Sequence, residues 1–144
     1  VENILKTIDP LTDLVIISGG EPLIWNMLPL TDALKKMNKK IHLETSGAYE
    51  LSGYWDWICL SPKKNKSPVP DLFKKANELK VIVYNKHDLI FAKQNAKYVE
   101  KDCVLFLQPE WSNKEKVMPL ISKFILENPN WRLSLQTHKY IDIK

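Results

Sequence analysis

The sequence predicts an α/β protein in which about six mostly parallel strands alternate with helices on the outside. Two observations predict this fold. Short apolar runs rich in β-branched residues alternate with longer stretches whose apolar residues recur at helical intervals. Strands of this kind, buried on both faces and each joined to the next by a helix, form parallel sheets with right-handed crossovers. The 144 residues contain no repeat and no interdomain linker, so one domain over 1–144 is expected.

The first half of the chain contains three of the predicted strands. The first covers 14–17 and stops at two adjacent glycines. A helix follows over 27–38, with Pro29 in its first turn and an inner stripe of Leu30, Ala33, Leu34 and Met37. The next strands cover 41–45 and 57–60, and a glycine and a proline follow them closely.

The second half predicts three more strands. Asp71 is expected to cap a short helix that runs through Leu79. A strand over 80–84, a helix over 88–98 and a strand over 104–107 then follow.

The last predicted helix begins near Ser112 and Glu115, which have the spacing of a capping box. Its apolar residues recur at helical intervals: Val117, Leu120, Ile121, Phe124 and Ile125. Pro119 lies within this pattern and predicts either a kink or a helix start close to it. Asn128-Pro129 ends the helix, and 132–136 form the sixth strand.

Composition and charge exclude several classes of protein. No apolar run approaches the roughly 18 residues that a membrane span needs. The net charge is +4, but Arg132 is the only arginine among 21 basic residues, which argues against sequence-specific nucleic-acid binding. Lysine pairs such as Lys39-Lys40 are expected on solvated helix faces. Cys59 and Cys103 lie in apolar runs and are expected as buried free thiols, which favours a reducing, cytoplasmic location.

Polar and glycine-rich clusters follow most of the predicted strands. Because the carboxyl ends of parallel strands share one edge of the sheet, these clusters predict a ligand site there. The first cluster is the most specific, since Gly19 and Gly20 let a ligand approach the backbone and Glu21 offers a carboxylate suited to an ammonium group. It is neither a dinucleotide fingerprint nor a P-loop. The alternative is a tight turn with a solvated glutamate.

The segment Ser18-Gly19-Gly20-Glu21-Pro22 resembles the GGEP motif of the radical S-adenosylmethionine (SAM) superfamily. Further segments narrow the resemblance to the 7-carboxy-7-deazaguanine synthase family of queuosine biosynthesis. They are Glu44-Thr45-Ser46-Gly47, Ser61-Pro62-Lys63, Leu107-Gln108-Pro109 and, above all, the segment from Trp131 to Tyr140. The resemblance runs in order from about Leu14 to the C-terminus.

The resemblance implies a partial (β/α) barrel of the radical SAM type and a carbon–nitrogen lyase activity. In that family 6-carboxy-5,6,7,8-tetrahydropterin becomes 7-carboxy-7-deazaguanine with loss of ammonia. A [4Fe-4S] cluster cleaves SAM reductively, the resulting 5′-deoxyadenosyl radical abstracts a substrate hydrogen, and SAM is regenerated. Magnesium and an external reductant such as flavodoxin are also implied.

Site residues follow from the same resemblance, position by position. Substrate contacts are expected from Ser18 and, if it is the natural end of the chain, from Lys144. An active-site rim is expected at Glu44, Thr45, Gln136 and His138. SAM contacts are expected from Gly19, Gly20, Glu21, Ser61, Pro62, Lys63, Gln108, Pro109, Glu110 and Trp111. Trp111 is a candidate for stacking on the adenine ring. His138 either orients substrate or relays a proton, or it only hydrogen-bonds a neighbouring loop.

One departure from the family is large. Radical SAM enzymes ligate their cluster through three cysteines of one N-terminal segment. Here Cys59 and Cys103 are 44 positions apart, so no metal ligands are expected in this sequence. We therefore expect the C-terminal two-thirds of such an enzyme, inactive on its own, with an open sheet edge that favours a homodimer. The alternatives are another radical SAM enzyme, such as a glycyl-radical activating enzyme, and a non-catalytic barrel that binds a nucleoside-like ligand.

Overall fold

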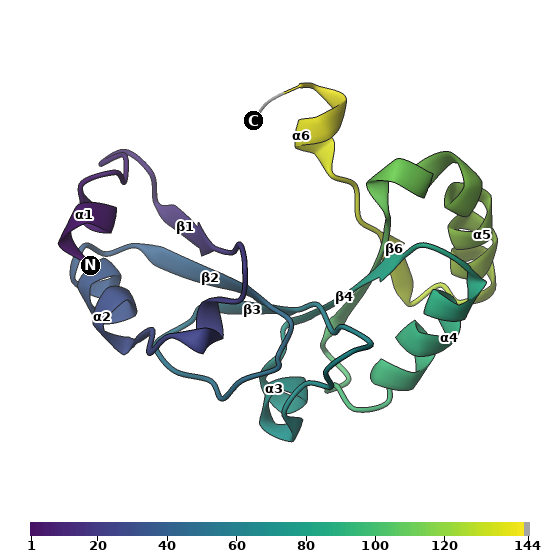
Figure 1. The fold of residues 1–144 in the computed structure, drawn as a ribbon, viewed down its shortest axis with the longest axis horizontal. Coiled ribbons are helices and arrows are strands. Elements are labelled where there is room, and N and C mark those ends of the chain that lie inside the picture. The colour runs from purple at the N-terminus through teal and green to yellow at the C-terminus, as the bar shows by residue number, and fades with distance from the viewer. Residues whose placement is uncertain (143–144) are drawn as a thin grey trace.

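The six strands of the sheet are all parallel and lie in chain order, β1-β2-β3-β4-β5-β6. This order comes from the computed structural model, which describes residues 1–142. The strands are β1 (Leu14–Ile17), β2 (Lys40–Thr45), β3 (Trp57–Leu60), β4 (Glu78–Val83), β5 (Val104–Pro109) and β6 (Trp131–Leu133). Each crossover moves one strand further in the same direction, as in the wall of a (β/α) barrel. The sheet forms an open arc (Figure 1), which confirms the predicted fold class.

Helices cover the outer side of this arc (Figure 1). The longer ones are α2 (Leu28–Lys36), α3 (Pro70–Lys75), α4 (Lys86–Asn95) and α5 (Lys114–Glu127). The short elements are α1 (Glu2–Leu5), η1 (Pro22–Ile24), η2 (Trp111–Asn113) and α6 (Thr137–Tyr140). None of the helices among residues 1–142 is long and apolar enough to cross a membrane.

The core lies between the outer face of the sheet and these helices. One cluster joins Val81 and Leu107 to Ile121 of α5, and a second joins Ile41 and Leu43 to Leu34 of α2. All six side chains are at most 1% exposed. Shortening such a fully buried side chain to alanine typically lowers the free energy of unfolding by about 2–5 kcal/mol.

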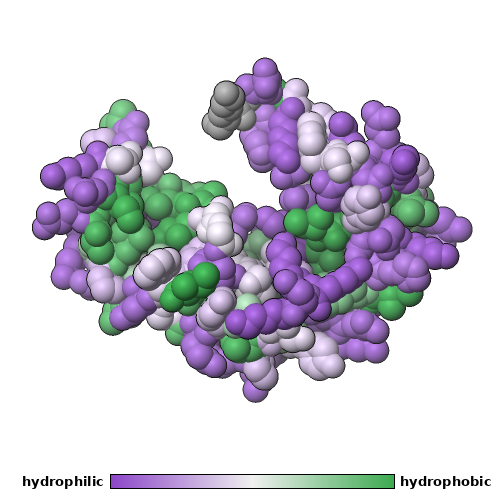
Figure 2. All heavy atoms as spheres, in the orientation of Figure 1, coloured by the Kyte–Doolittle hydropathy of each residue, from purple (hydrophilic) through white to green (hydrophobic). Residues whose placement is uncertain are grey.

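The inner face of the sheet is open among the described residues. In β2 and β4 buried and less buried residues alternate, so each strand buries one face only. The prediction of strands buried on both faces was therefore wrong for β2 and β4, whereas β3 buries Ile58, Cys59 and Leu60 in succession. Ile16 is 58% exposed and Ile82 is 36% exposed on the inner face. Figure 2 shows the hollow that this face forms between the two ends of the sheet.

Several predicted element boundaries were wrong because a neighbouring element begins earlier. Helix α3 ends at Lys75 rather than Leu79, since β4 already starts at Glu78. Asp71 lies in the first turn of α3, and Val69 is the N-cap. Helix α4 spans Lys86–Asn95, displaced from the predicted 88–98, and begins with an Asn85/Asp88 capping box.

The C-terminal elements also differ from the prediction. Ser112 belongs to η2 and its hydroxyl donates to Glu110, so the predicted capping box does not form and Asn113 is the N-cap of α5. Helix α5 begins at Lys114 and continues past Pro119. Strand β6 ends at Leu133, whereas 132–136 was predicted; residues 134–136 form no regular element, and α6 begins at Thr137.

Lys39 is a correction to the expectation of solvated lysine pairs. It is 8% exposed, and its ammonium donates to the backbone carbonyls of Pro10 and Thr12. These two carbonyls precede β1, so the lysine ties the entry of β1 to the start of β2. A buried ammonium group needs such acceptors because it has lost its water.

The loop after β1 is fixed to the end of β2 by the carboxylate of Glu21. Oε1 accepts hydrogen bonds from the Leu23 N–H at 3.2 Å and from the Thr45 hydroxyl at 2.5 Å. Oε2 accepts from the Ser46 N–H at 2.8 Å and from the Ser46 hydroxyl. Burial acts to raise the pKa of Glu21, but these hydrogen bonds outweigh it and hold the pKa below its ordinary value of 4.5.

We predict that Glu21→Gln lowers the free energy of unfolding by about 1–2 kcal/mol at pH 7, because donors lose their charged acceptor. The folded-state pKa is depressed, so the stabilisation is present above the unfolded-state pKa of about 4.3. It disappears as the pH falls through the lower folded-state pKa. Urea unfolding from pH 7 to pH 3 measures both effects. The variant should lose less stability than the parent on acidification, and exposed Glu50→Gln is the control.

We also predict that Gly47→Ala is more destabilising than Gly19→Ala, although both glycines have positive φ, +78° and +84°. A methyl group at Gly47 would lie 2.5 Å from Leu60 Cδ1 and 2.8 Å from Pro68 Cβ, whereas one at Gly19 meets nothing within 4 Å. Gly19→Ala should cost about 1–2 kcal/mol of backbone strain. Gly47→Ala should add about 1–3 kcal/mol of overpacking. Equal losses in urea unfolding would contradict this packing.

Candidate functional site

A cavity of about 490 Å3 opens at the carboxyl edge of the sheet. Its volume lies in the range of small-molecule sites, about 300–1,000 Å3. The wall comes from β2, β4 and β5 and from the segments that follow β1, β2, β3 and β6. The lining residues are Gly19, Gly20, Glu44, Thr45, Ser46, Ser61, Lys63, Lys80, Ile82, Gln108, Ser134, Leu135, Gln136 and His138.

Nine of the residues predicted for the site meet in this cavity. Five of them were predicted to contact SAM: Gly19, Gly20, Ser61, Lys63 and Gln108. The other four are the whole predicted rim: Glu44, Thr45, Gln136 and His138. His138 was placed at the end of a strand but lies in α6. Residues from five predicted clusters therefore form one site, while their roles in binding stay predictions.

Six other predicted residues do not line the cavity: Ser18, Glu21, Pro62, Pro109, Glu110 and Trp111. Burial explains one of them, Pro62, and strand alternation explains another, Pro109. Pro62 is buried between Ser61 and Lys63, and Pro109 follows Gln108 on the opposite face. Glu21 is held by its four hydrogen bonds. Lys144 lies outside the described residues.

Five lining residues were missed by the sequence analysis: Ser46, Lys80, Ile82, Ser134 and Leu135. Two of them had a usable signal. Lys80 and Ile82 alternate with the buried Leu79, Val81 and Val83 of β4, so alternation alone directs them to the other face. Ile82 lies opposite Gln108 in the register of β4 and β5.

At the two glycines the cavity wall is bare backbone, and a side chain at either position would project into open space. Gly19 and Gly20 have φ of +84° and +52°, a region that L side chains rarely adopt. A Cβ at either position would meet nothing within 4 Å. The backbone amides and carbonyls of this turn are therefore open to a ligand.

The cavity carries both signs of charge. Lys80 donates to Glu44 Oε1 at 2.8 Å, and its side chain is only 13% exposed. Burial acts to lower the pKa of Lys80, but Cys59 together with the Glu44 and Glu78 carboxylates outweighs it and raises the pKa. Lys63 adds a second ammonium group, which is exposed. A ligand with both an amino and a carboxylate group suits this set of charges.

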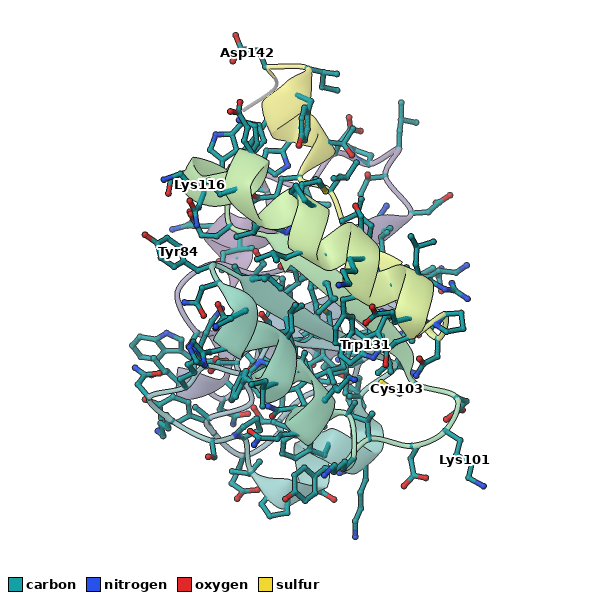
Figure 3. The ribbon with its side chains drawn as sticks, turned by 90° about the vertical axis from the view of Figure 1, so that its right-hand side faces the viewer. Tyr84, Lys101, Cys103, Lys116, Trp131 and Asp142 are labelled. Atoms are coloured by element: carbon teal, nitrogen blue, oxygen red, sulfur yellow. The ribbon has the colours of Figure 1, made fainter. Side chains whose placement is uncertain are left out.

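Neither cysteine fits a metal centre. Cys59 Sγ donates to Glu78 Oε1 at 3.3 Å, and burial raises the pKa of its thiol. Burial also raises the pKa of the Cys103 thiol, to about 11. Cys103 lies beside Trp131, at the opposite end of the sheet from Tyr84 (Figure 3). Metal-binding thiols need a lowered pKa.

Among residues 1–142, no three His, Cys, Asp or Glu side chains come together to hold a metal ion. The described residues therefore do not supply the three thiolates that an iron–sulfur cluster of this kind needs.

Comparison with known proteins found no matching family model. The chain is 57% identical over 129 residues to 7-carboxy-7-deazaguanine synthase of Flavobacterium psychrophilum, covering 90% of this chain and 61% of the relative. It is 45% identical to the synthase of Synechocystis sp., covering 90% and 62%. It is 36% identical to that of Prochlorococcus marinus, covering 90% and 68%. The chain thus spans about three fifths of the first two relatives.

A solved structure gives the same result. The crystal structure of QueE from Escherichia coli matches with a TM-score of 0.76 and 31% identity, over 88% of this chain and 57% of that chain. The order of parallel strands, the cavity at their carboxyl edge and these relatives lead to one conclusion. The chain belongs to the 7-carboxy-7-deazaguanine synthase family and has its radical SAM-type α/β fold.

Proposed function

We propose that this chain forms the SAM-binding part of a 7-carboxy-7-deazaguanine synthase, a radical SAM lyase. The observation that carries the proposal is the meeting of the Gly19-Gly20 turn with Ser61, Lys63 and Gln108 in one cavity. These residues come from the loops after β1 and β3 and from the end of β5, which are far apart in the sequence.

The proposed reaction of the whole enzyme converts 6-carboxy-5,6,7,8-tetrahydropterin into 7-carboxy-7-deazaguanine with loss of ammonia. The [4Fe-4S] cluster, magnesium and an external reductant such as flavodoxin belong to that proposed activity. The chain described here contributes binding and orientation to it.

The backbone of the glycine turn would bind the amino group of the SAM methionine. An ammonium group needs acceptors, and the carbonyls of Gly19 and Gly20 belong to two exposed residues that line the cavity. The carboxylate of Glu21 would support this turn without touching the ligand, since its four hydrogen bonds hold the turn against β2. This differs from a direct contact of Glu21 with the ammonium group.

The lysines and the amide would bind the rest of SAM. Lys63 is exposed and, among residues 1–142, donates only to the Ser61 hydroxyl, at 3.4 Å, so its ammonium would reach the methionine carboxylate. Lys80 adds a largely buried positive charge. Gln108 is 9% exposed, and its Oε1 lies 3.4 Å from the Ser134 hydroxyl that donates to it. Its N–H groups are therefore left for the adenosine part of the ligand. Glu44 offers a carboxylate to hydroxyl groups.

The pterin substrate would lie against Gln136 and His138, with Ser18 and Lys144 as further proposed contacts.

A cytoplasmic location is proposed because both cysteines are free thiols. A homodimer is proposed because the sheet has an open edge. Strand β1 is an edge strand among the described residues, and Ile16 on it is 58% exposed.

Isothermal titration of SAM into the purified chain tests the proposal. We expect binding that Lys63→Gln weakens about tenfold or more, since loss of a charge-assisted hydrogen bond costs about 1.5–3 kcal/mol. Gly20→Val should weaken it at least as much, because its side chain projects into the open space of the turn. Lys74→Gln removes an equally exposed lysine far from the cavity and should leave the affinity unchanged.

Two results would contradict the proposal. One is a parent chain that is folded by circular dichroism and binds no SAM at millimolar concentration. The other is binding that Lys63→Gln and Lys74→Gln weaken to the same extent, because that would show a non-specific effect of charge.

A further inference from the structure

The segment after β6 contributes two residues to the cavity, although the helix in this segment buries none of its own residues. Gln136 and His138 line the cavity, and α6 begins between them at Thr137. The helix has four residues and buries none of them. A helix this short is not stable in water by itself, because nucleation costs more than a single turn returns. Contacts with the rest of the chain must hold it.

Trp111 supplies such contacts. Its ring and that of Tyr140 lie edge to face, with centroids 5.0 Å apart and an angle of 83° between the planes. This is the arrangement that the charge distribution of two aromatic rings favours. The ammonium of Lys139 lies 5.2 Å from the centre of the Trp111 ring. Two neighbouring residues of α6 therefore contact one side chain of η2.

The Trp111 ring already packs against other side chains, which argues for a role other than stacking on adenine. The ammonium of Lys114 lies 4.2 Å from the centre of the same ring, so three side chains of the chain already engage it. Trp111 also does not line the cavity, although Gln108 three residues earlier does.

We propose that Trp111 and Tyr140 form a latch that holds α6 at the carboxyl edge of the sheet and so positions His138 in the cavity. Trp111 is then a positioning residue for the pterin side of the site. The ring contacts alone support the latch. Its role in binding the pterin rests on the proposed function.

The first arm of the test measures the latch without any ligand. Backbone 15N order parameters of residues 137–140 are compared in the parent, Tyr140→Leu, Trp111→Leu and Tyr140→Phe. We expect values near 0.8 in the parent and in Tyr140→Phe, which keeps the ring, and values below about 0.6 in the two leucine variants. Values that stay near 0.8 in both leucine variants would overturn the latch.

The second arm measures what the latch serves. Under anaerobic conditions, the Kd of 6-carboxy-5,6,7,8-tetrahydropterin in the presence of SAM should rise at least fivefold in Tyr140→Leu and return to the parent value in Tyr140→Phe. The Kd of SAM should stay within twofold in all variants. If Trp111→Leu instead weakens SAM binding while residues 137–140 remain ordered, Trp111 contacts SAM and the proposal is wrong.

The two arms separate this proposal from the proposed function. A parent chain that binds neither SAM nor the pterin refutes the function, and the order parameters still decide the latch. A loosened α6 with unchanged pterin affinity would show that the latch exists but positions nothing that the substrate needs, which overturns the positioning role.

Discussion

The cavity depends on the carboxylate of Glu21 more than on any other single group. Its two oxygens accept four hydrogen bonds, from η1 on one side and from the end of β2 on the other. A carboxylate has about four acceptor positions, so the group is fully used within the chain. Without this tie the glycine turn would have no fixed orientation relative to Thr45 and Ser46, which form the adjacent wall.

Strand alternation then selects which residues of each motif reach the cavity. In β4 the leucine and valines face the helices, and Lys80 and Ile82 face inward. The same rule turns Gln108 inward and Pro109 outward, whereas burial separates Pro62 from Ser61 and Lys63. A contiguous motif in the sequence therefore divides into residues that can contact a ligand and residues that support the backbone.

The sequence predicted the features that depend on local pattern. Strands 14–17 and 57–60 were predicted with the right bounds, and the carboxyl-edge rim of Glu44, Thr45, Gln136 and His138 does line the cavity. The features that depend on distant partners were not predictable in this way. Lys39 is buried because two carbonyls before β1 accept from it, and Trp111 faces a ring 29 positions later in the chain.

The most direct test of the central claim uses the glycines, because the chain has only four. The chain is labelled with 15N-glycine and titrated with SAM, and the four amide signals are followed. We predict that Gly19 and Gly20 shift together and saturate, while Gly53, packed against Thr31 of α2, stays in place. Unmoved signals of Gly19 and Gly20 in a folded chain, or a shift of Gly53 alone, would contradict it.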